Sequence, residues 1–265
     1  MDRQIAFVLL DQPTAVDMHA VAQAVRTRHP DVPVEVVAAP AQNGHGAAQS
    51  PLIRCGDELV TVMNVPAPLP QDPGEEVWAR AARTWPQARA VAKGHRAHLI
   101  VATIGKVASP LREARVVTAV IGGLLDVVPK CLAVMWAARV VRSAAQWKDE
   151  SRTTFAPYPN YPFLLWIDIA AIRTGAGVDA VTVGLSSFVD REIEFEVGQL
   201  NPSDVLNNVA GLAGYLIEHG NVVKDGDTFG GSDAERIRIR HAVSTHRRGV
   251  PVLRVAAAGG TRKDH

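Results

Sequence analysis

The stretch IAFVLLDQPTAVDMHAVAQAVRTRH, residues 5–29, decides the fold class, because a short apolar run passes directly into a helical pattern. Residues 5–10 are apolar and end at Asp11-Gln12-Pro13, which is typical of a buried strand. The residues that follow place one apolar face along a helix, formed by Val16, Ala20, Val21, Ala24 and Val25. The chain is therefore expected to begin with a strand and then a helix.

The rest of the first 108 residues continues this alternation. Residues 32–37 and 59–65 are rich in valine and bounded by Pro or Gly, so they predict strands. The run Pro66-Ala-Pro-Leu-Pro70 ends the second of these strands. Residues 74–93 have a helical pattern and residues 98–104 again predict a strand. The predicted order of the first half is β-α-β-β-α-β.

A similar order is predicted after residue 130. Strands are expected at residues 131–137, 163–169, 180–186 and 193–197, and a short helix at 142–147. Pro202-Ser203-Asp204 favours the start of a helix that runs to about His219. Three closing strands are expected, at residues 221–224, 236–242 and 250–255. The second half therefore approximates β-α-β-β-α-β with added strands.

These patterns predict an α+β protein of two ferredoxin-like β-α-β-β-α-β halves, packed as one body with antiparallel or mixed sheets. The halves are residues 1–108 and 131–258, joined by a connecting helix at 109–130 and followed by a flexible tail at 259–265. The two halves share no obvious sequence identity, so a duplication is inferred from the pattern alone. The alternative is a single larger sheet, which the long loops near the end of the chain could mark.

Charge and composition restrict the function classes. With 28 basic and 27 acidic residues the net charge is +1, so no overall field attracts nucleic acid or an anionic membrane. Only Cys55 and Cys131 are present, which indicates reduced thiols and no disulfide framework. The apolar stretch 116–128 contains Asp126 and is too short to span a bilayer, so it predicts a buried helix. The first apolar run is too short for a signal peptide, and a cytoplasmic location is expected.

A second stretch, GNVVKDGDTFGGSDAERIRIR at residues 220–240, combines an Asp-Gly turn, a glycine pair and an alternating strand. Together with Trp136, Arg139, Trp166 and residues 184–196, it resembles a bacterial domain-of-unknown-function family whose last third carries an Asp-Gly-Asp-Thr-(Ile or Phe)-Gly signature. That resemblance implies no reaction. It suggests an accessory or immunity role, in which a toxin is neutralised by contact.

Trp136, Arg139 and Trp166 are candidate contact residues. Trp and Arg supply large contact areas and planar donors at interfaces and in pockets. Both tryptophans lie in apolar segments that predict strands, where core packing is the ordinary expectation. A ligand or partner cleft is the alternative.

Glu192 and Glu194 belong to an alternating row, with Glu196, that favours a solvated strand face. An acid/base or metal role is the alternative, because the three carboxylates lie on one side of a strand. Arg236, Arg238 and Arg240 form a similar basic row. If the two strands were neighbours, the two rows could pair across the sheet.

Asp225, Asp227 and Thr228 surround Gly226 and predict an Asp-Gly turn in which Asp227 and Thr228 bond local amides. Neither register of a calcium-binding loop supplies the required acids, although a looser cation site stays open. His95 and His98 have no third ligand at a supporting spacing, so no metal site is predicted. His95 is expected to be solvated, and His98 to bond the backbone.

No catalytic set, metal site or cofactor fingerprint emerges from the sequence. The expected function is therefore non-catalytic binding of an unidentified protein partner, with no nucleic acid and no membrane involved. The alternative is an enzyme or small-molecule-binding protein with a cleft between the two halves. Its charged groups would surround Trp136 and Trp166, and they would be Arg139, Glu192, Glu194, Asp225 and Asp227.

Overall fold

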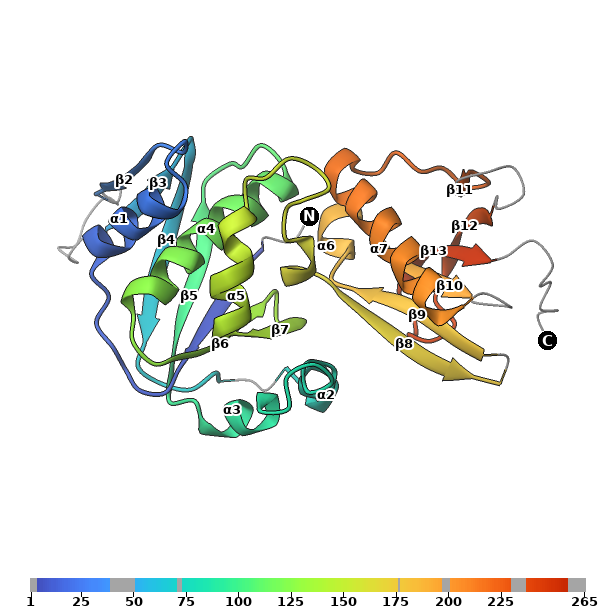
Figure 1. Cartoon of the computed structure of the whole chain (residues 1–265), viewed down its shortest axis with the longest axis horizontal. Coiled ribbons are helices and arrows are strands. Elements are labelled where there is room, and N and C mark those ends of the chain that lie inside the picture. The colour runs from blue at the N-terminus through green and yellow to red at the C-terminus, as the bar shows by residue number, and fades with distance from the viewer. Residues whose placement is uncertain are drawn as a thin grey trace. The chain divides into compact units, whose positions relative to one another are not determined.

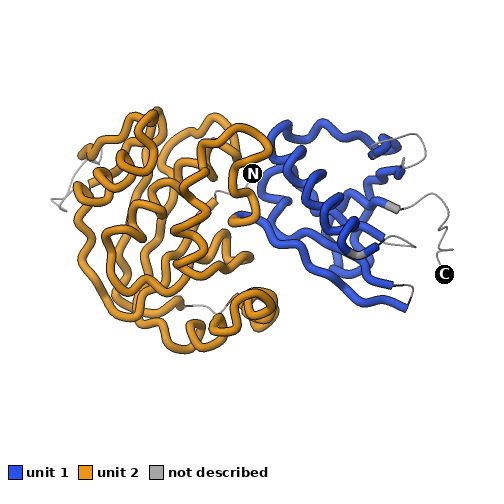
Figure 2. The backbone as a smooth tube through the Cα atoms, in the orientation of Figure 1, with its two compact units in different colours: residues 1, 166–265 blue, residues 2–165 orange. Residues whose placement is uncertain are grey.

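The computed structural model describes residues 4–38, 51–70, 73–175, 177–196, 201–229 and 237–256. The chain forms two compact units, an N-terminal unit of residues 2–165 and a C-terminal unit of residues 166–265 with residue 1 (Figure 2). The boundary thus follows Leu165, whereas the sequence placed the connection at residues 109–130. The predicted tail, residues 259–265, lies outside the described residues.

The N-terminal unit contains one seven-stranded sheet with the order β2-β3-β4-β5-β1-β6-β7. Its strands are β1 (Ala6–Leu10), β2 (Val34–Val37), β3 (Leu52–Cys55), β4 (Glu58–Val65), β5 (Ala97–Ile104), β6 (Cys131–Trp136) and β7 (Val140–Ser143). All neighbouring pairs are antiparallel. This seven-stranded sheet is larger than the four-stranded sheet of a single β-α-β-β-α-β unit, so the predicted ferredoxin-like arrangement is not confirmed.

Among the described residues, five α-helices belong to this unit, and Figure 1 shows their arrangement. They are α1 (Met18–Arg28), α2 (Glu75–Ala81), α3 (Ala88–Gly94), α4 (Pro110–Val127) and α5 (Ala144–Glu150). The Asp17 carboxylate accepts from the first free amides of α1, and the Ser109 hydroxyl does the same for α4. Helix α4, predicted from sequence as a connector, instead packs within the unit against α1, β4 and β5.

The close approach of α1 and α4 depends on a glycine pair in the middle of α4. A Cβ atom on Gly123 would lie 2.6 Å from Val25 Cγ2 and 3.0 Å from the Val21 carbonyl oxygen. A Cβ atom on Gly122 would lie 2.8 Å from Ser151 Oγ. Glycine therefore allows the two helices to approach at a distance that any side chain would obstruct.

The C-terminal unit contains a six-stranded mixed sheet with the order β11-β12-β13-β10-β9-β8. Its strands are β8 (Asp168–Thr174), β9 (Gly177–Val183), β10 (Glu192–Glu196), β11 (Thr228–Phe229), β12 (Ile237–Val243) and β13 (Pro251–Ala256). Strands β10 and β13 are parallel, and the other neighbouring pairs are antiparallel. The α+β class with antiparallel and mixed sheets is therefore confirmed.

In the part of this unit that the structure describes, the helices are α6 (Ser186–Val189) and α7 (Pro202–His219). Helix α7 packs against β8, β9 and β10. One predicted strand was wrong at its start, because Phe163–Leu165 form a 3-10 turn and the strand begins only at Asp168. The strand predicted at residues 221–224 was also wrong, because that segment has no strand pairing and leads into the Asp225-Gly226 turn. Within the described ranges, no helix has both the length and the apolar character that a membrane crossing requires.

Candidate functional site

Strand β10 carries two buried carboxylates. Glu192 is 3% exposed and Glu194 is 0% exposed, so the predicted solvated row of glutamates was wrong at both positions. Only Glu196, at the end of the strand, is partly exposed. A buried carboxylate must be compensated by hydrogen bonds or by positive charge. The neighbours of each carboxylate therefore decide what it can do.

Glu192 is held by hydrogen-bond donors from the segment that joins β9 to α6. Its carboxylate accepts from Thr182 Oγ1 at 2.7 Å, Gly184 N at 2.9 Å, Leu185 N at 3.1 Å, Ser186 N at 3.2 Å and Ser186 Oγ at 2.8 Å. Three of these donors are backbone amides. Glu192 thus fixes the path of this turn and has a structural role.

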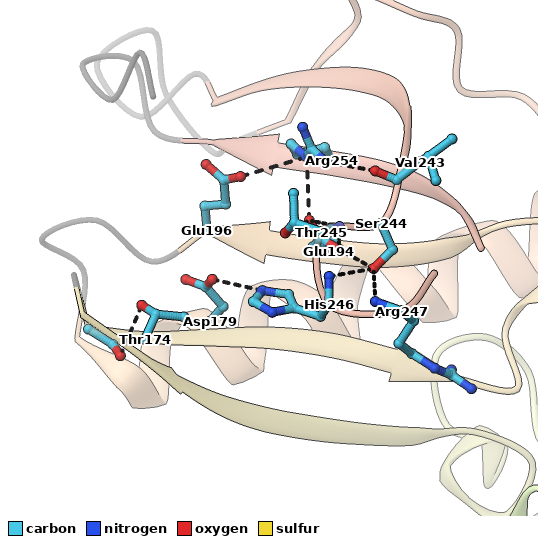
Figure 3. Close-up of polar contacts among 11 residues, drawn as sticks. Thr174, Asp179, Glu194, Glu196, Val243, Ser244, Thr245, His246, Arg247 and Arg254 are labelled. Carbon is cyan, nitrogen blue, oxygen red and sulfur yellow. Dashed lines mark hydrogen bonds and ion pairs between the residues drawn. The ribbon is translucent and has the colours of Figure 1, made fainter. Parts of the chain in front are cut away.

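Glu194 is held by the loop between β12 and β13 (Figure 3). Its carboxylate accepts from Ser244 Oγ at 2.5 Å and from Thr245 N at 3.1 Å and Oγ1 at 2.8 Å. Arg254 Nε lies 3.4 Å away on the neighbouring strand. Burial alone would raise the pKa of Glu194, but the hydrogen bonds and the Arg254 charge outweigh burial and lower the pKa.

The same loop makes a second contact with the sheet. His246 Nε2 lies 2.9 Å from Asp179 Oδ2 on β9, and both side chains are largely buried (Figure 3). Ser244 Oγ also accepts from the amides of His246 and Arg247. We call Asp179, Glu194, Ser244, Thr245, His246 and Arg254 the loop anchor, because the loop residues bond Asp179 of β9 and Glu194 of β10, and Arg254 of β13 pairs with Glu194.

The loop anchor is a poor catalytic arrangement. A serine nucleophile needs a general base within hydrogen-bond reach. The hydroxyl of Ser244 donates to Glu194, whose lowered pKa makes it a weak base, while the His246 ring is engaged by Asp179. The geometry supports loop positioning rather than proton transfer.

Glu194 is expected to make folding stability depend on acidity. The pKa of Glu194 is lowered in the folded state, so its carboxylate adds to the free energy of unfolding above the ordinary glutamate pKa of about 4.3. This contribution is lost as the pH falls through the pKa of Glu194 in the folded protein. Glu194→Gln should therefore reduce the free energy of unfolding at pH 7 and flatten its decline in acid. Urea unfolding at several pH values between neutrality and strong acid measures both effects. An acid decline as steep in this variant as in the Glu196→Gln control would contradict the assignment.

The predicted basic row does not pair with the glutamates. Strand β12 neighbours β13, and Arg240 lies opposite Arg254 rather than opposite a carboxylate. Arg238 and Arg240 are exposed, and no hydrogen-bond or ion-pair partner for either side chain is found within the described ranges. Arg236 lies outside those ranges. The cross-strand pairing was therefore wrong, because β13 is inserted between the two charged strands.

Asp225 and Asp227 form part of a turn that docks on β12. Gly226 has φ +90°, and Asp227 accepts from the amide of Lys224 at 2.8 Å. Asp225 accepts from the amide of His241 at 2.7 Å, and Thr228 in β11 pairs with Arg238. The predicted local bonding is present for Asp227, whereas Asp225 secures a neighbouring strand.

The two candidate tryptophans pack in the cores of different units. Trp136 is 1% exposed and stacks on Trp147, and Trp166 is 0% exposed and stacks on Phe188. Arg139 is exposed in the tight turn after β6, where its amide donates to the Trp136 carbonyl oxygen at 2.9 Å. The predicted candidate set is thus divided between the N-terminal and C-terminal units.

The histidine pair tethers a loop. His98 bonds the Ala67 carbonyl oxygen, as expected, but His95 is 8% exposed and the prediction that it is solvated was wrong. Its Nε2 accepts from the amide of Leu69 at 3.0 Å. Among the described residues, no group of three or more His, Cys, Asp or Glu side chains converges as metal ligands would.

The two cysteines are ordinary thiols. Burial raises the pKa of Cys55 to about 11 and that of Cys131 to about 12, so both are protonated at neutral pH. Both are free of disulfides.

The three loop residues of the loop anchor were not identified from the sequence. Ser244, Thr245 and His246 follow the alternating strand directly, and a run of polar residues before Arg247-Arg248-Gly249 predicts only a turn. Their partners lie far away in the sequence, so no local signal identified the contact.

Residues 181–256 match the model of the family described as Domain of unknown function (DUF4261). The matched region covers β10, α7 and the loop anchor except Asp179, and it supports the resemblance to an uncharacterised domain family. No curated protein and no solved structure matches the chain.

Proposed function

We propose that this chain is a non-catalytic protein-binding protein whose C-terminal unit contacts an acidic partner through Arg238 and Arg240. The observation that carries the proposal is that both guanidinium groups are exposed on one face of β12 and have no partner within the described ranges. We call these two residues the arginine pair.

The hydrogen bonds of the two buried carboxylates on β10 support the proposed role of the arginine pair. Glu192 and Glu194 could have neutralised a basic strand, but both are buried and bonded to other groups. Arg254, next to Arg240, is already engaged by Glu194 and Glu196. Positive charge on β12 is therefore left uncompensated by the neighbouring strands.

Arginine is suited to this role. Its planar guanidinium binds carboxylates through two parallel hydrogen bonds, and arginine is enriched at the centres of protein interfaces. Two arginines separated by one residue on a strand project from the same side, where they can meet successive acidic side chains. The proposed setting is the cytoplasm, and a toxin neutralised by contact is one form that the partner could take.

The test is quantitative capture of partners by the tagged protein from cells that encode it, followed by binding measurements with the purified partner. The double variant Arg238→Ala/Arg240→Ala should lose at least about tenfold in affinity, since each charged contact at an interface commonly contributes 1 kcal/mol or more. The wild-type affinity should also fall as salt is added.

The matched control is Arg54→Ala/Arg89→Ala, which removes the same charge from two exposed arginines of the N-terminal unit. Equal loss in both double variants would indicate a general charge effect and would contradict the assigned surface. A chain that captures no partner at stoichiometric level while remaining folded would contradict the binding function itself.

A further inference from the structure

The N-terminal unit contains a pocket of about 520 Å³ beside α2 and α3. Its lining comes from the segment after β4, from α2, from the end of α3 and from the two residues that join α3 to β5. The apolar part of the lining includes Pro68, Leu69, Pro73, Trp78 and Ala92. The volume lies within the range of small-molecule sites.

Two cations complete the lining. Lys93 and Arg96 are both exposed, and within the described ranges neither side chain has a hydrogen-bond or ion-pair partner. By contrast, the exposed Arg89, which lies in α3 together with Lys93, forms an ion pair with Glu75 at 2.6 Å. Among the described residues, no acidic side chain therefore neutralises the two positive charges at the pocket.

The pocket wall is held in place before any ligand binds. His95 accepts from the amide of Leu69 through Nε2 at 3.0 Å, and its Nδ1 lies 2.9 Å from the Ala92 carbonyl oxygen. With Nε2 as acceptor, Nδ1 carries the proton and donates, which defines a neutral ring. His98 bonds the Ala67 carbonyl oxygen at 2.9 Å. The two histidines thus hold the proline-rich segment, residues 66–70, against the end of α3 and against β5.

We infer that this pocket binds a small organic anion, consisting of an aromatic or compact apolar group that carries a carboxylate or phosphate. The apolar part contacts Trp78 and the proline-rich segment, and the anionic group contacts Lys93 and Arg96. The inference is independent of the arginine pair, because the two sites lie in different units.

Titration of the full-length protein with phenyl phosphate, followed by NMR signals of the tryptophan indole groups, tests this site. Saturable shifts with a Kd on the order of 1 mM or below are expected, in keeping with the size of such a fragment. Lys93→Ala/Arg96→Ala should weaken binding at least about tenfold. Both side chains are exposed, so the fold should persist.

The control is Arg83→Ala/Arg89→Ala, which makes the same charge change at two exposed arginines outside the pocket lining. This variant should bind as the wild type does. Unchanged binding by Lys93→Ala/Arg96→Ala, or no saturable binding by the wild type, would overturn the inference. If inorganic phosphate bound as tightly as phenyl phosphate, the proposed contact between an apolar group of the ligand and the pocket would be contradicted.

Discussion

Glu192→Ala is expected to lower the free energy of unfolding by about 3–5 kcal/mol, which is a large part of the stability of a typical domain. The reason is that the carboxylate accepts five hydrogen bonds, most of them from buried donors. Removing it leaves the buried Thr182 hydroxyl and the buried amides of Gly184 and Leu185 without this acceptor. Urea or thermal unfolding of the purified chain measures the loss.

Glu192→Gln provides a milder variant should the alanine protein fail to accumulate. The amide keeps one acceptor oxygen but turns a donor toward other donors, so an intermediate loss is expected. Glu196→Ala is the control on the same strand, and it should change stability by less than about 1 kcal/mol. The Glu196 side chain is partly exposed, and its ion pair with Arg254 is long, at 3.6 Å. Equal losses at both positions would refute the structural role of Glu192.

Gly123→Ala should also destabilise the chain, by about 1–3 kcal/mol, although alanine favours helices over glycine. The added methyl group would lie 2.6 Å from Val25 Cγ2 and 3.0 Å from the Val21 carbonyl oxygen, and a valine in a helix has little rotamer freedom with which to move away. The helices α1 and α4 would have to separate. Chemical denaturation of the variant gives the size of the effect.

Gly211→Ala is the matched control, because Gly211 lies within helix α7 and no atom stands within 4 Å of its added Cβ. That substitution should raise stability by about 0.5–1 kcal/mol through helix propensity alone. The two variants therefore have opposite expected signs for the same chemical change. A stabilising Gly123→Ala would show that the α1 and α4 contact tolerates a side chain.

Much of the secondary structure could be read from local pattern. The strand at residues 6–10, the helix near 18–28 and the long helices α4 and α7 match the predicted segments. The strand is a compact apolar run, and each helix has an apolar pattern and a capping residue. The segment at 163–165 did not match, because its apolar residues follow Pro162 and turn instead of extending. Apolar composition alone does not separate a buried strand from a buried turn.

The burial of the glutamates in the candidate site could not be predicted from the local sequence pattern. Alternation placed Glu192, Glu194 and Glu196 on one side of a strand, and that side was expected to face water. Whether a sheet face is solvated depends on what covers it. Here the loop at residues 244–247 covers Glu194, and its contact partners are about fifty residues apart in the sequence.

By itself the sequence determined the α+β class, the positions of the main helices and strands, the Asp-Gly turn and the absence of a disulfide framework, because each depends on neighbouring residues. Only the tertiary structure decided the strand orders, the boundary after Leu165, the burial of Glu192 and Glu194, and the insertion of β13 between those glutamates and the arginine pair. These depend on which distant segments meet, and the free energy of such contacts comes from desolvation and hydrogen bonding between residues that no local period connects.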